Sequence, residues 1–117
     1  MNVEEFRDYC LSKKGVTEEF PFDNQTLVYK VMGKMFSLGN VDNFQTMNLK
    51  CDPEKAIDLR ERYDGIIPGF HMNKKHWNTV DSFSDVPEEV QFHLIDHSYD
   101  LVASSLTKKL KEELKTL

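Results

Sequence analysis

The feature that most constrains the fold of this chain is a side-chain repeat of two between Thr26 and Cys51, which is the repeat of a β-strand. The pattern runs through residues 27–32 and recurs in residues 35–38 and 47–51. Strands this close in sequence pair most simply with their neighbours, so we expect an antiparallel meander of three strands.

Turn residues separate these predicted strands. Gly33-Lys34 predicts a tight hairpin, and residues 39–45, rich in Asn and Asp, predict a looser connection. The segment Phe20-Pro21-Phe22 must run extended, since proline restricts its own φ and its predecessor. It would add a fourth strand if it joins the sheet.

Helix signals flank the meander. Asn2 and Glu5 have the spacing of a capping box and predict a helix over residues 3–13, while Asp52-Pro53 predicts a second helix over residues 53–63. Residues 85–89 open a third helix, whose apolar stripe is expected to contain Val90, Leu94, Ile95, Leu101 and Val102.

The remaining segments complete the predicted architecture. Thr107 is expected to cap a short last helix, residues 66–69 to form a loop, and residues 77–80 to form a further strand. A sheet covered by helices gives an α+β fold, a two-layer sandwich with the helices packed on an antiparallel sheet. At 117 residues we expect one domain, residues 1–117.

Charge and cysteine content limit the class of protein. The formal net charge is −5, yet residues 27–80 hold eight basic and six acidic side chains, so positive charge gathers in the middle of the chain. Cys10 and Cys51 lie far apart in sequence and are expected to be buried free thiols. An acidic N-terminus and the lack of a long apolar run predict a cytoplasmic protein with no membrane partner, most simply a monomer.

The segment from Gly69 to Val80 combines two lysines, two histidines, two asparagines and the only tryptophan. Lysine ammonium groups contact phosphates, and amide and imidazole groups add neutral hydrogen bonds, which is the chemistry of nucleic-acid contact. Trp77 is expected to pack in the structural core. The predicted DNA-contact residues in and around this segment are Lys34, Lys50, Asn73, Lys74, Lys75, His76 and Asn78. The alternative interpretation of each lysine is an ordinary position on a solvated surface, or at a strand edge where lysine discourages pairing between molecules.

Metal and catalytic sites have little support. His93 and His97 have an i, i+4 spacing, but no H-E-x-x-H motif is present and no third ligand is placed by the sequence. There is no nucleophile elbow and no phosphate-binding glycine loop. We therefore expect no metal, no cofactor and no enzymatic activity.

Five motifs resemble the MmcQ/YjbR family of small bacterial proteins over nearly the whole chain. They are residues 2–10, 15–22, 48–53, 69–78 and 96–102. The resemblance implies a CyaY-like fold and a DNA-binding role through two β-rich wings, with no enzymatic activity. Carried over by position, it marks His71, Asn73, Lys74, His76, Trp77 and Asn78, with Lys50 from the strand motif.

The leading hypothesis is therefore a non-enzymatic protein that binds duplex DNA with weak sequence preference. The alternative is a small-molecule or protein-interaction module that uses a cleft between the sheet and the third helix, lined by Phe70, Trp77 and Tyr99. A third hypothesis, iron binding by the acidic side chains of Glu4, Glu5 and Asp8, rests only on fold-level similarity to frataxin-type proteins.

Overall fold

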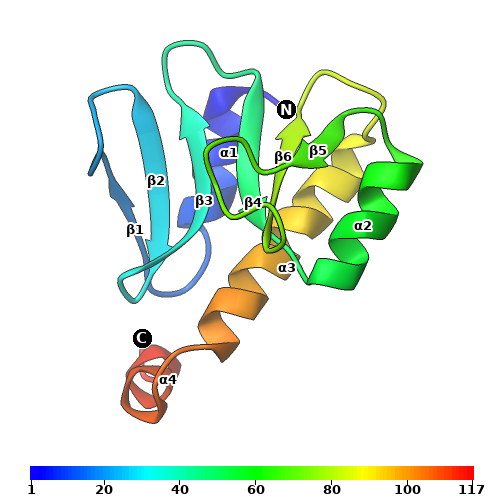
Figure 1. Ribbon diagram of the computed structural model, residues 1–117. Coiled ribbons are helices and arrows are strands. Elements are labelled where there is room, and N and C mark those ends of the chain that lie inside the picture. Colours follow the sequence, from blue (N-terminus) through cyan, green and yellow to red (C-terminus); the bar gives the residue numbers. More distant parts are fainter.

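Six antiparallel strands form one open sheet in the computed structural model, which describes residues 1–117 (Figure 1). The strands lie in the order β1-β2-β3-β4-β6-β5, so β5 is an edge strand and β6 lies inside the sheet. Four helices accompany the sheet, and the predicted α+β two-layer architecture is confirmed. The elements are α1 Val3–Leu11, β1 Val16–Glu19, β2 Thr26–Val31, β3 Lys34–Asn40, β4 Thr46–Lys50, α2 Pro53–Arg62, β5 Ile66–Pro68, β6 Trp77–Asp81, α3 Glu88–Ser104 and α4 Lys108–Lys115.

The predicted helix caps are confirmed. Asn2 Oδ1 accepts a hydrogen bond from the Glu5 amide at 2.8 Å, and the Glu5 carboxylate accepts one from the Asn2 amide at 3.2 Å, which completes the capping box of α1. The Asp52 carboxylate caps α2, and the Thr107 hydroxyl caps α4. Each cap satisfies backbone N–H groups that the helix itself cannot, so the starts of α1, α2 and α4 can be identified from the sequence. The helix α3 begins after Pro87 without a side-chain cap.

The β2–β3 hairpin turns one residue earlier than predicted. Val31 pairs with Lys34, which leaves Met32 and Gly33 as the two turn residues. Their φ angles are 49° and 89°, the positive pair of a type I′ turn, whose twist matches that of the strands. Glycine adopts this conformation without steric cost, whereas Met32 adopts it under strain.

One expectation about the sheet edges was wrong, and one open question is settled. Ile66–Pro68 is not a loop but the edge strand β5, in which Pro68 pairs with Asn78 of β6. Proline is tolerated there because β5 has a neighbour on one side only. At the opposite edge the additional strand is Val16–Glu19, and Phe20-Pro21-Phe22 lies in the connection that follows it.

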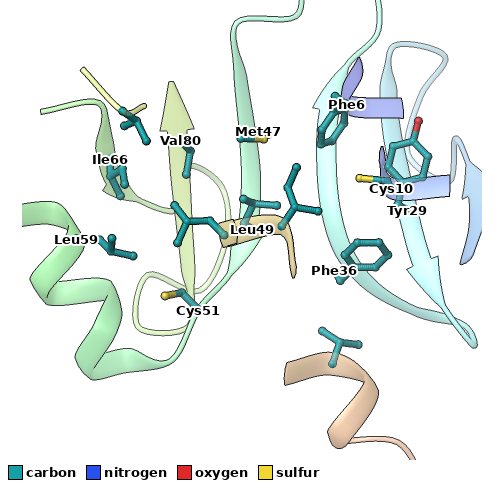
Figure 2. Packing of buried hydrophobic residues seen from close by; sticks show 14 of the residues in the cluster. Phe6, Cys10, Tyr29, Phe36, Met47, Leu49, Cys51, Leu59, Ile66 and Val80 are labelled. Carbon is teal, nitrogen blue, oxygen red and sulfur yellow. The ribbon is translucent and has the colours of Figure 1, made fainter. Parts of the chain in front are cut away.

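The main core lies between one face of the sheet and the helices α1, α2 and α3, and Figure 2 shows its side chains converging from both layers. Phe6 of α1 meets the Tyr29 ring edge-on at a centroid distance of 5.5 Å. The buried stripe of α3 differs from the predicted one, since Val90 and Leu101 are only half-buried. Its buried members are Gln91, Leu94, Ile95, Ser98 and Val102.

Two polar residues of that stripe connect α3 to neighbouring segments. Ser98 Oγ donates to the Phe36 carbonyl at 2.5 Å and accepts from the Lys50 amide at 2.9 Å, while Gln91 bonds to both the hydroxyl and the carbonyl of Ser82. These bonds fix α3 to the sheet and explain why polar side chains are tolerated in the core.

No helix covers the other face of the sheet, which we call the helix-free face. A small cluster of Val28, Leu38 and Trp77 is buried there, with Met35 and Met72 packed against it. Trp77 is 8% exposed, and it is covered by the segment between β5 and β6 rather than by a helix. No helix in the chain has the length and apolar character needed to cross a membrane.

Candidate nucleic-acid interface

The strand register brings three lysine-bearing segments to one end of the sheet. The β2–β3 hairpin, with Lys34, lies beside the last residue of β4, Lys50, because β3 and β4 are antiparallel. Lys50 pairs with Trp77, the first residue of β6, so the segment 69–76 leaves the sheet at this same end. Strand pairing thus brings lysines that are 40 residues apart in sequence to the same end of the sheet.

The helices add more lysines at this end. Lys14, which follows α1, has its Nζ 3.3 Å from the Lys115 carbonyl, and Lys34 Nζ lies 3.5 Å from the Ser105 carbonyl that precedes α4. Figure 1 shows α4 below the β2–β3 hairpin, at the end of the molecule away from the N-terminus. We call this region the lysine end, and it holds all twelve lysines: Lys13, Lys14, Lys30, Lys34, Lys50, Lys55, Lys74, Lys75, Lys108, Lys109, Lys111 and Lys115.

Nine of the twenty acidic side chains gather at the opposite end. They come from the start of α1, from the loops between strands and from the start of α3, where the chain turns away from the lysine end. The net charge of −5 is therefore unevenly distributed, although Asp52, Glu54, Glu112 and Glu113 lie on elements of the lysine end. The residues are Glu4, Glu5, Asp23, Asp42, Asp64, Asp81, Asp85, Glu88 and Glu89.

The segment 69–76 presents its predicted contact residues on a loop. Asn73 Oδ1 accepts hydrogen bonds from the amides of Lys75 at 3.0 Å and His76 at 3.2 Å, which shapes the loop. Lys74 Nζ donates to the Gly69 carbonyl at 2.8 Å, while the Lys75 side chain is exposed and has no partner in the protein. This loop geometry lets neighbouring polar side chains act together, which a strand would prevent.

Asn78 does not belong to this exposed set. Its side chain is 2% exposed, and its Oδ1 accepts a hydrogen bond from Arg60 Nε at 2.7 Å. Asn78 pairs with Leu49 and therefore points toward the helix-covered face of the sheet. Its expected contact with an external ligand is corrected to an internal one, because a buried acceptor committed to Arg60 cannot reach a phosphate or a base.

Lys34 and Lys50 share an end of the sheet but not a face. Lys34 pairs with the core residue Val31 and points toward the helices, whereas Lys50 pairs with Trp77 on the helix-free face. The predicted lysines are thus gathered around one end of the molecule and do not form a flat patch on one side.

A groove that the sequence did not reveal crosses the helix-free face. It has a volume of about 380 Å³, within the range of small-molecule sites. The β1–β2 connection and the segment 69–76 border it, and it continues along the sheet past Asn40 and Thr46. We call it the sheet groove, and its lining residues are Phe22, Thr26, Leu38, Asn48, Phe70, His71 and Met72.

Hydrogen bonds to the sheet hold one wall of this groove in place. The Phe70 amide donates to Thr79 Oγ1 at 2.9 Å, and Asn48 Nδ2 donates to the Phe70 carbonyl at 3.4 Å. Thr79 Oγ1 in turn donates to Asn48 Oδ1 at 2.5 Å. The backbone of Phe70 is anchored, while the residue as a whole remains 63% exposed.

Comparison with known proteins gives the family of the chain. The family model described as YjbR matches residues 11–101. The chain belongs to the YjbR family. It is 30% identical to the uncharacterized protein YjbR of Escherichia coli strain K12 over 115 residues, which cover 97% of this chain and 98% of that protein. It is 37% identical to the uncharacterized protein YbdF of Escherichia coli O157:H7 over 91 residues, covering 77% of this chain and 75% of YbdF.

Solved structures of similar proteins share the architecture. The crystal structure of Deinococcus radiodurans protein DR2400, with the family-model domain DUF419, matches with a TM-score of 0.90 at 38% identity, covering 97% of this chain and 88% of that one. A Pseudomonas syringae protein matches with a TM-score of 0.74 at 28% identity, covering 87% of this chain and 99% of that one. The YjbR-family assignment and the six-stranded α+β fold therefore agree.

The cleft expected between the sheet and α3 is not present in this YjbR-family chain. The space between β4, β6, α2 and α3 is about 10 Å³, room for one water molecule at most. Trp77 and Phe70 lie on the helix-free face, whereas Tyr99 packs edge-on against Phe36 on the other face, at 5.4 Å. The only spacious region near Phe70 is the sheet groove.

The histidines of α3 have structural surroundings. His97 Nε2 accepts a hydrogen bond from the Asp52 amide at 3.1 Å, next to the start of α2. Burial, with the nearby Lys55 ammonium, lowers the pKa of His97 and favours the neutral ring that accepts this bond. No three His, Cys, Asp or Glu side chains are grouped so as to hold a metal ion.

Proposed function

We propose that this protein binds DNA without catalysing a reaction, and that the lysine end contacts the phosphate backbone. The observation that carries the proposal is the convergence of all twelve lysines at one end of the molecule. The proposal includes a cytoplasmic monomer that binds duplex DNA with weak sequence preference. Backbone contacts of this kind supply affinity but carry no direct sequence information.

The acidic net charge does not oppose this role as strongly as the total suggests. The molecule is 39 Å long, whereas the Debye length is about 10 Å at 0.1 M salt. Carboxylates at the far end are therefore largely screened from a polyanion at the lysine end. Within that end, only Lys13 and Lys30 form ion pairs, with Asp96 at 2.5 Å and Glu19 at 3.4 Å.

The contact residues divide into cationic and neutral groups. Lys50 and Lys75 have unpaired ammonium groups, and Lys34 and Lys74 donate only to backbone carbonyls, so all four can contact phosphates. The exposed side chains of His71, Asn73 and His76 lie in the same loop and supply neutral hydrogen bonds. Asn78 takes no part, since it is buried.

Salt-dependent titration of a labelled duplex tests the proposal. If four phosphates are neutralised, log K falls against log salt with a slope of about −3.6, roughly a 150-fold loss of affinity between 50 and 200 mM. Replacing Lys75 by Ala is expected to flatten the slope by about 0.9. The matched control is Arg62→Ala, which removes one exposed positive charge at the far end of α2 and is expected to leave the slope unchanged.

Two outcomes would contradict the proposal. The first is no detectable binding of duplex DNA at low salt. The second is an equal effect of Lys75→Ala and Arg62→Ala, which would mean that total charge rather than the lysine end governs the interaction. Analytical ultracentrifugation of the complex checks whether one monomer binds per site.

A further inference from the structure

The side chains of the helix-free face form rows across the strands. One row, Val28, Leu38, Asn48 and Thr79, contributes to the floor of the sheet groove. The next row toward the lysine end contains Lys30 and Lys50, two residues farther along their strands. Two residues of a strand span about 7 Å, so the backbone of this lysine row lies about 7 Å from the row that contributes to the groove floor.

The groove itself is neutral and partly aromatic. None of its lining residues is Lys, Arg, Asp or Glu. Phe22 and Phe70 border it from two different loops and are 64% and 63% exposed, values that no packing role explains. The groove therefore suits an uncharged flat group, while charge of the same ligand is accommodated outside it.

Polar groups for orienting such a ligand lie along the groove. Asn40 Oδ1 accepts hydrogen bonds from the amides of Asp42 and Asn43, while Asn40 Nδ2 and the Thr46 hydroxyl make no hydrogen bond within the protein. Asn48 is held by Thr79 and by the Phe70 carbonyl. A few fixed hydrogen-bonding groups on an apolar floor are typical of ligand sites.

The wall that carries Phe70 is preformed. His71 has a φ of 58°, a left-handed conformation that histidine adopts at a steric cost, and its ring lies 4.0 Å from the Phe70 ring. The hydrogen bonds from Phe70 to the sheet maintain this conformation, and strained backbone held in this way is concentrated at ligand sites.

We infer that the sheet groove binds a planar nucleobase whose attached phosphate lies at the lysine end, as an unpaired base of a single strand does. Phe70 and Phe22 stack on the base, Asn48 lies beneath it, and Lys50 faces the adjoining phosphate. The inference rests on the proposed function and refines it, because a base-paired duplex cannot place a base in this groove. A free nucleotide has the same chemistry and is distinguished below.

The experiment compares a twelve-nucleotide oligothymidylate, its duplex with oligoadenylate, and free thymidine monophosphate. The variant is Phe70→Ala, and its matched control is Phe83→Ala, which removes a phenylalanine that is 60% exposed but lies outside the groove. Phe70→Trp retains a stacking surface. Thermal melting checks that each variant is folded. Both phenylalanines are exposed, so neither substitution is expected to prevent folding.

The expected result is tighter binding of the single strand than of the duplex by the native protein. Phe70→Ala weakens single-strand binding by about tenfold, leaves duplex binding and the salt slope unchanged, and Phe70→Trp restores the affinity. Phe83→Ala has no effect. If Phe70→Ala binds both forms as the native protein does, the groove inference is overturned and the backbone proposal survives.

Binding of free thymidine monophosphate distinguishes failure of the DNA-binding proposal from failure of the groove inference. If neither oligonucleotide form binds, the proposed DNA role fails, and NMR shifts of the Phe22, Phe70 and Asn48 amides on adding thymidine monophosphate decide the groove. Shifts confined to those amides support a nucleotide site independent of DNA. No shifts, together with no oligonucleotide binding, overturn the inference.

Discussion

Arg60 joins α2 to the segment that carries the candidate interface, and replacing it tests that connection. Its Nε donates to the buried Asn78 Oδ1 at 2.7 Å, and its terminal nitrogen donates to the carbonyls of Lys74 and Trp77. Arg60→Met keeps the aliphatic stem but removes every donor. Asn78 Oδ1, in a side chain that is 2% exposed, is then left without a partner.

The size of the effect follows from these contacts. An unsatisfied buried acceptor costs about 1–3 kcal/mol, and we take about 2 kcal/mol for Asn78. Loss of the bond to the more exposed Lys74 carbonyl adds about 0.5 kcal/mol, since water replaces the donor there. We expect Arg60→Met to lower the free energy of unfolding by about 2.5 kcal/mol, which corresponds to a fall in Tm of about 10 °C for a domain of this size.

Urea denaturation followed by circular dichroism measures the change. Arg62→Met is the matched control, because it removes the same group from the same helix at an exposed position and is expected to cost under about 0.5 kcal/mol. The double variant Arg60→Met with Asn78→Leu removes both partners, so its cost should be at least about 1 kcal/mol less than the sum of the single costs. If Arg60→Met and Arg62→Met are equally destabilised, the hydrogen bond from Arg60 to Asn78 does not contribute to stability, which refutes the prediction.

Two further predictions concern titratable groups in the core and at its margin. Burial raises the pKa of Cys10 to about 12 and that of Cys51 to about 11, so both thiols should react only slowly with Ellman's reagent in the native protein. Two equivalents should react once denaturant is added. Fast reaction of either thiol in the native protein would contradict this prediction. Burial opposes ionisation of Asp96, but hydrogen bonds from Lys13 and Tyr9 outweigh it and lower the pKa of Asp96. A carboxyl group whose pKa is lowered by folding adds stability above its unfolded pKa, about 3.9, and this stability is lost as the pH falls through the folded pKa. Asp96→Asn should therefore flatten the loss of stability below about pH 4. An unchanged dependence of stability on acid pH would refute the role of this group.

Sequence patterns predicted the elements whose cause is local. A helix cap involves residues three positions apart, so Asn2 with Glu5, and Asp52 with Pro53, could be read directly. The strands β2, β3 and β4 followed from the repeat of two, and Gly33 marked the turn between the first two. These signals act within a few residues, and the tertiary structure did not override them.

The errors fall where tertiary pairing decides the outcome. Ile66–Pro68 is too short and too close to Gly69 to be distinguished from a loop, and it becomes a strand only because β6 offers it an edge. The stripe of α3 was misassigned because Gln91 and Ser98 are polar, yet both are buried by bonds to partners distant in sequence. Hydropathy alone cannot identify such residues, since their partners are set by the fold.

The candidate interface depended most on information that the sequence does not contain. A lysine near a hairpin, another at a strand end and four in the last helix are separate facts until the strand order places β4 between β3 and β6. The repeat of two likewise showed that Asn48 and Leu49 face opposite ways, but not which of them the helices cover. Because α1, α2 and α3 all cover the Leu49 side, the Asn48 side is left open to Phe22 and Phe70, and a neutral groove arises next to the cationic end of the same sheet. One topological choice thus produces both features, and the inference of a ligand with a flat uncharged part and an anionic part rests on their occurring together.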